Sequence, residues 1–124
     1  MTVSELRIGN WVAHDGLPFY IRDVEDLSDI ERTLKHGTFT PIPLTEEWLL
    51  KFGFQLHSEY SFRNFMLPKN KFFICRWMED KPSVGVEETG AFYWSDHLLK
   101  IEYVHQLQNL YWCLCGEELT IAEP

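Results

Sequence analysis

The segment Thr45–Phe54 carries both a helix start and a helix stop, and this pairing constrains the fold more than any other local pattern in the chain. Thr45 has the side-chain oxygen of a good N-cap residue, and the two glutamates that follow it suit the positive end of a helix. Gly53 supplies the left-handed residue that ends many helices, and the final phenylalanine can close over Leu49 in a Schellman ending. We therefore predict a short capped helix that covers the open side of a sheet.

The N-terminal segment predicts a β hairpin. Residues 6–14 are predicted as one strand, which leads to Asp15 and Gly16, the dipeptide that is the strongest short hairpin signal. Phe19–Val24 is the returning strand. Pro18 lies at its start, where a missing ladder donor does the least harm.

The acidic stretch Glu25–Lys35 is poorly periodic, and both a loop and a short helix stay open for it. Thr38–Thr40 is predicted to return to the sheet before two prolines stiffen the chain. The order of strand, hairpin, strand, excursion and return resembles a small SH3-like half-barrel, which is a likeness of fold only. We assign residues 1–44 to this N-terminal β subunit.

The middle of the chain predicts a meander of antiparallel strands. Ser61–Met66 and Lys71–Met78 are rich in the aromatic and branched residues that strands prefer, and Leu67–Asn70 is a plausible turn between them. Further strands are predicted over Ser83–Glu87, Ala91–Ser95 and Leu98–Tyr103.

A second helix is predicted from Tyr103 to its end at Gly116, and two of its sides differ in chemistry. At about 100° per residue, one side is apolar and suits a core; it consists of Val104, Leu107, Leu110, Tyr111 and Leu114. The neighbouring side concentrates an imidazole, an indole and two amides, which are His105, Trp112, Gln108 and Asn109. No other segment gathers such side chains in one sector.

Two interpretations of that polar side stay open. As a recognition surface, the amides would bind hydrogen-bonding edges and the indole would stack on a planar ring. As internal structure, the glutamine and histidine would satisfy backbone groups of neighbouring loops. We add Trp94 to the candidate contact residues, because a small domain has little room to bury all of its 5 tryptophans.

Charge and hydropathy restrict the class of partner. The formal charge of −8 repels phosphate backbones, so duplex nucleic acid is not an expected ligand, although a local positive pocket for a small anion is compatible with it. No apolar run reaches the roughly 18 residues of a membrane span, and the N-terminus lacks the apolar stretch of a signal peptide. We therefore expect a cytoplasmic protein without a membrane partner.

The sequence predicts no catalytic residue, no metal site and no cofactor. Cys113 and Cys115 lie about 200° apart on the helix, which suits neither a mutual disulfide nor shared zinc ligation. Ser95, Asp96 and His97 are adjacent in sequence, and adjacency is not the geometry of a triad. Nucleophile-elbow and phosphate-loop motifs are missing from the sequence.

Two long segments carry a family resemblance. Pro41–Phe54 and Tyr103–Tyr111, the latter followed by Gly116–Thr120, resemble an uncharacterised family of small phage- and prophage-associated proteins of gut-type bacteria. The opening Leu6–Val12 also fits this family. The resemblance implies a setting in mobile elements and no particular activity. The chain departs from the family pattern at Trp112–Cys115.

We predict one α+β domain over residues 1–124, in which residues 45–124 form a helix, a meander and a helix packed on the sheet. The predicted function is a non-enzymatic binding protein of a mobile element that contacts or sequesters a host or phage protein, and a homo-oligomer is compatible with the sequence. One alternative is a protein that sequesters a small nucleotide or signalling metabolite with its aromatics and Arg22, Arg63 or Arg76. The other is an enzyme of an unrecognised type.

Overall fold

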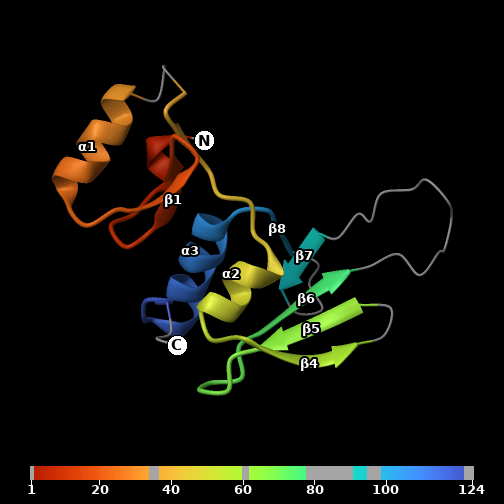
Figure 1. The fold of residues 1–124 in the computed structure, drawn as a ribbon. Helices are drawn as coiled ribbons and strands as arrows, with labels where there is room; N and C mark the ends of the chain where they lie inside the picture. The colour runs from red at the N-terminus through yellow and green to blue at the C-terminus, as the bar shows by residue number, and fades with distance from the viewer. Residues whose placement is uncertain (1, 34–36, 60–61, 78–90, 95–98, 122–124) are drawn as a thin grey trace, which may run out of the picture. The chain divides into compact units, whose positions relative to one another are not determined.

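Helices and antiparallel sheets make up an α+β fold, which we describe from a computed structural model (Figure 1). The structure describes residues 2–33, 37–59, 62–77, 91–94 and 99–121. The chain forms two compact units. The first consists of Met1–Pro43 and Tyr103–Leu119, and the second of Leu44–Glu102 and Thr120–Pro124.

The first unit contains the predicted hairpin. Strands β1 (Trp11–His14) and β2 (Leu17–Tyr20) pair in antiparallel register, with His14 opposite Leu17. Asp15 and Gly16 between them both have positive φ, 52° and 82°, which is the geometry of a type I′ turn. The two-residue strand β3 (Phe39–Thr40) pairs with the other side of β1. Pro18 lies in β2, an edge strand, where its missing N–H is tolerated.

The acidic stretch that sequence left undecided is mostly helix α1 (Val24–Thr33). The Asp23 carboxylate accepts the Asp26 N–H at 2.9 Å, and the Asp26 carboxylate accepts the Arg22 N–H at 2.9 Å. These bonds satisfy donors at the start of the helix, and Leu27 and Ile30, which lie about one turn apart, pack in the core of the unit. One buried apolar cluster of this unit consists of Leu6, which follows the short 3-10 helix η1 (Val3–Glu5), with Val12, Ile21, Ile30 and Phe39.

Helix α3 (Val104–Cys115) ends at Gly116, which has a φ of 70° and donates its N–H to the Trp112 carbonyl at 2.9 Å. The sequence places this helix in the segment 45–124, whereas its contacts group it with Met1–Pro43. Its buried side is also rotated from the predicted one. Leu114 is 49% exposed, while His105 and Gln108 join the buried residues of the helix.

The second unit begins with the predicted capped helix, α2 (Glu46–Lys51). The Thr45 hydroxyl accepts the Trp48 N–H at 3.3 Å. At the other end, Gly53 has a φ of 93° and the Phe54 N–H bonds the Leu49 carbonyl at 3.0 Å, which confirms the Schellman ending.

The rest of the second unit is an antiparallel meander whose strand order follows the sequence. Tight backbone bonds between Leu67 and Phe72 close one of its turns. The predicted strand Ser83–Glu87 lies outside the described residues. The strands are β4 (Gln55–Glu59), β5 (Phe62–Met66), β6 (Phe73–Trp77), β7 (Ala91–Trp94) and β8 (Leu99–Ile101).

Candidate functional site

The polar side of α3 bonds the segment around η1 and the residues that lead into β1. Its hydrogen-bond partners lie between Glu5 and Trp11, close to a hundred positions earlier in the chain. We call the residues that join the two segments the loop–helix cluster, and it consists of Arg7, Asn10, Gln108, Asn109 and Glu118.

Gln108 is fully buried, and its side-chain amide bonds backbone groups that a neighbouring strand could otherwise pair with. Its side-chain oxygen accepts the Trp11 N–H at 2.9 Å, and its side-chain nitrogen donates to the Gly9 carbonyl at 2.8 Å. One side-chain amide thus bonds a backbone acceptor in the turn at Gly9 and a backbone donor at the start of β1, as a peptide group of a neighbouring strand could. The bond to the Gly9 carbonyl is buried, and the bond to the Trp11 N–H is partly buried.

Asn109 uses both ends of its amide in the same manner. Its nitrogen donates to the Glu5 carbonyl at 2.8 Å. Its oxygen accepts the side-chain nitrogens of Asn10 at 3.0 Å and Arg7 at 2.8 Å. Asn10 is itself fully buried, and its oxygen accepts the Arg7 N–H at 2.7 Å. The loop thus has its polar groups satisfied by the helix.

The guanidinium of Arg7 is held on several sides. Besides Asn109, it bonds the carboxylate of Glu118 and donates to the Gln108 carbonyl at 3.3 Å. Its central carbon lies 5.2 Å from the ring centroid of Trp112, which is a cation–π distance. Trp112 is 44% exposed, so this pair carries an indole at the surface beside a fixed cation.

His105 lies inside the protein beside Glu5. Its Nε2 is 3.3 Å from a Glu5 carboxylate oxygen, and its ring is parallel to that of Tyr103, with centroids 5.9 Å apart. Burial lowers the pKa of His105, and the hydrogen bond to Glu5 opposes part of this shift. The pKa of Glu5 is lowered as well, chiefly by a hydrogen bond from the Thr2 backbone.

The five residues chosen from the sequence therefore lie in different surroundings. His105, Gln108 and Asn109 have internal partners, which fits the structural interpretation of the polar side of α3. Trp112 is the member of that side with substantial exposure. Trp94 lies in β7 of the other unit, half-buried, with its ring centroid 6.2 Å from that of Phe72.

A further feature, which sequence reasoning missed, is a hollow of about 590 Å³ in the first unit. We call it the α1 hollow, because it is lined by side chains from α1 and from the three-stranded sheet; its lining includes His14, Phe19, Phe39, Arg22, Asp29 and Arg32. Only Arg22 was named in the sequence as a possible ligand contact. Asp29 and Arg32 share α1, but the aromatic residues come from three separate strands, so no single spacing pattern links the lining.

The remaining chemical candidates from the sequence are the cysteines, the metal-ligating side chains and the segment around Ser95. All three cysteines are free thiols, and burial raises the pKa of Cys115. Within the described ranges, no group of three metal-ligating side chains comes together. Ser95, Asp96 and His97 lie outside those ranges, as do the side chains of Arg63 and Arg76.

No protein-family model, curated protein or solved structure matches this chain. Among the described residues, no helix has both the length and the apolar character needed to cross a membrane.

Proposed function

We propose that this chain is a non-enzymatic binding protein that contacts another protein through Arg7 and Trp112. The observation that carries this proposal is the exposed indole of Trp112 stacked on a guanidinium that is already fixed in place. Tryptophan and arginine are the residues most enriched at the energetic centres of protein interfaces.

The loop–helix cluster supports this role through pre-organisation. Arg7 is bonded to Asn109, Glu118 and the Gln108 carbonyl before any partner arrives. A long side chain that is ordered in advance loses little conformational entropy on binding, which leaves more of the contact energy for affinity. On this proposal, the amides of α3 position the contact residues and do not touch the partner themselves.

Charge suggests the chemistry of the partner. The chain has a formal charge of −8, and Glu117 and Glu118 close to Trp112 in sequence are both partly exposed. A partner with a basic surface around a pocket that accepts an aromatic ring would be steered toward this face by the negative charge. Because of the family resemblance, we propose that this partner is a host or phage protein and that the chain acts for a mobile element.

The test compares matched single variants in affinity capture followed by mass spectrometry. Trp112→Ala is expected to lose a protein that the unaltered chain retains. Leu50→Ala removes a comparably exposed apolar side chain on α2 and should retain it, since Leu50 is 58% exposed and lies in the other unit. The captured protein is then purified and titrated against both variants.

Arg7→Lys sharpens the test, because lysine keeps the charge and loses the planar group that stacks on the indole. We expect a loss of affinity smaller than that of Trp112→Ala. If the captured protein binds Trp112→Ala as tightly as the unaltered chain, the proposed contact surface is wrong. Sedimentation of the isolated protein tests whether the partner is a second copy of the chain.

A further inference from the structure

The α1 hollow has an aromatic floor. The rings of His14 and Phe39 are stacked, with centroids 4.3 Å apart and planes within 7° of parallel. Phe19 meets Phe39 edge-on, with centroids 5.3 Å apart. Phe39 belongs to the core, but the His14 side chain is still 43% exposed. A planar ligand therefore finds an accessible ring beside a rigid aromatic base.

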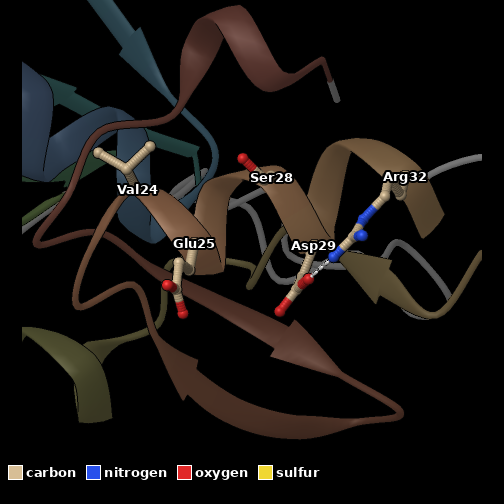
Figure 2. Close-up of a pocket in the computed structure, with 5 residues that line it drawn as sticks. All are labelled: Val24, Glu25, Ser28, Asp29 and Arg32. Carbon is tan, nitrogen blue, oxygen red and sulfur yellow. Dashed lines mark hydrogen bonds and ion pairs between the residues drawn. The ribbon is translucent and has the colours of Figure 1, made fainter.

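Two arginines stand along the wall of the α1 hollow. The side chains of Arg22 and Arg32 are 71% and 73% exposed. Arg22 bonds Asp26 through Nε at 3.2 Å, and its two terminal nitrogens have no hydrogen-bond partner among the described residues. Figure 2 shows Arg32 and Asp29 reaching toward each other from successive turns of α1. This pair also borders a smaller hollow of about 290 Å³ on the same helix.

We propose that the α1 hollow binds a small planar aromatic ligand that carries an anionic group, with a nucleoside monophosphate as the type. The volume of about 590 Å³ suits a ligand of that size. The ring would stack against His14, and the anionic group would bond those N–H groups of Arg22 and Arg32 that have no hydrogen-bond partner in the described part of the chain. This proposal uses a different surface from the Arg7–Trp112 pair and does not depend on it.

The balance of charge in the α1 hollow indicates that the ligand needs an aromatic ring in addition to its anionic group. Asp26 and Asp29 offset the two arginines, so a bare inorganic anion gains little from the local charge. Asp29 is half exposed, and its carboxylate can accept a hydrogen bond from a sugar hydroxyl. The combination of stacking, guanidinium and carboxylate groups thus selects a nucleotide over free phosphate.

The experiment titrates the full chain with AMP, GMP, CMP and UMP, with the matching nucleosides, and with inorganic phosphate. Calorimetry gives the affinities, and amide chemical shifts locate the site. We expect at least one nucleotide to shift residues of β1, β2 and α1. Removal of its phosphate should weaken binding by about tenfold or more, because a charge-assisted hydrogen bond is lost.

Arg32→Gln and His14→Ala test the two halves of the site. Each substitution should lower the affinity for the nucleotide by about tenfold or more. Lys100 lines neither hollow, so Lys100→Gln should leave the affinity unchanged. Arg32 is exposed, so its variant keeps the fold even if His14→Ala does not. Three outcomes overturn the proposal: no nucleotide binds at millimolar concentration, phosphate binds as well as the nucleotides, or Arg32→Gln binds like the unaltered chain. Retained binding in Trp112→Ala separates this site from the proposed protein contact.

Discussion

The two units of this chain are joined internally by different hydrogen bonds. In the unit built on Leu44–Glu102, strands that are neighbours in the sheet are also neighbours in sequence, and backbone ladders connect them. In the other unit, Met1–Pro43 and α3 are joined largely by side chains, as between Trp11 and Gln108, which are 97 positions apart. The first arrangement follows from local pairing, and the second requires specific side chains at distant positions.

This difference changes how the polar side of α3 is interpreted. A row of amides on α3 resembles a recognition surface when only its composition is known. In the structure the same amides bond backbone groups of Glu5 and Gly9, which precede β1, and of Trp11, the first residue of β1. A buried amide is therefore as costly to remove as a length of backbone ladder, because the groups it leaves behind are equally unsatisfied.

The largest effect is expected from Gln108→Ala. It removes the hydrogen-bond acceptor of the Trp11 N–H and the donor to the Gly9 carbonyl, at about 1–3 kcal/mol each, so the free energy of unfolding should fall by about 4 kcal/mol. Urea denaturation measures the loss, and hydrogen exchange should show a faster Trp11 amide. Cys113→Ala on the exposed part of the same helix is the control, with an expected change below about 0.5 kcal/mol. Equal effects from the two variants would mean that Gln108 does not replace a strand.

Gly9→Ala should be the next most destabilising change. Gly9 has a φ of +100°, and a Cβ there would lie 2.9 Å from the Glu118 carboxylate. We expect a loss of about 2–3 kcal/mol. Gly16→Ala is a matched control, because its φ is also positive, at +82°, but open space surrounds it; only the backbone cost of about 1 kcal/mol should appear. If the two variants unfold at the same denaturant concentration, close packing against the loop–helix cluster is not important.

A smaller loss of stability is expected from a change at the cap of α2, in the unit built on Leu44–Glu102. Thr45→Ala removes the acceptor of the Trp48 N–H and should cost about 1 kcal/mol. Thr45→Ser keeps the hydroxyl and should restore most of this stability. In hydrogen exchange, the effect should appear at the Trp48 amide and leave the Trp11 amide unchanged. Faster exchange at Trp11 would show that the two units do not respond independently.

The smallest effect is expected from pH acting on His105. Burial lowers its pKa in the folded state below the ordinary value of about 6.5. The unfolded chain then binds more protons than the folded chain, so stability is complete above about pH 6.5 and declines as pH falls through the lowered pKa. Thermal unfolding between about pH 7.5 and 5.5 should show this decline. His105→Gln should flatten the curve over that interval, and an unchanged slope would exclude His105 as its source.

Local chemistry explains which elements could be predicted. The turn at Asp15 and Gly16 and the ending at Gly53 depend on which residues tolerate positive φ. Helix α1 stayed undecided in the sequence, because its inward side mixes Leu27 and Ile30 with the buried carboxylate of Asp26, which hydropathy assigns to the surface. For the polar side of α3, both a recognition surface and an internal role stayed open in the sequence. Hydropathy treats Gln108 as a surface residue, and only a partner with matching backbone groups makes its burial favourable.

The sequence alone determined the elements whose conformation is decided within a few residues: the hairpin, the capped helix α2, the end of α3 and the α+β class. Only the tertiary structure decided which side chains of α3 turn inward, that Arg7 is fixed beside Trp112, and that aromatic rings and arginines meet in the α1 hollow. The physical reason is the sequence separation over which each kind of interaction acts. Dihedral preferences and helix caps act between residues close in sequence, whereas the satisfaction of a buried amide or the lining of a hollow depends on groups that the folded chain brings together from far apart.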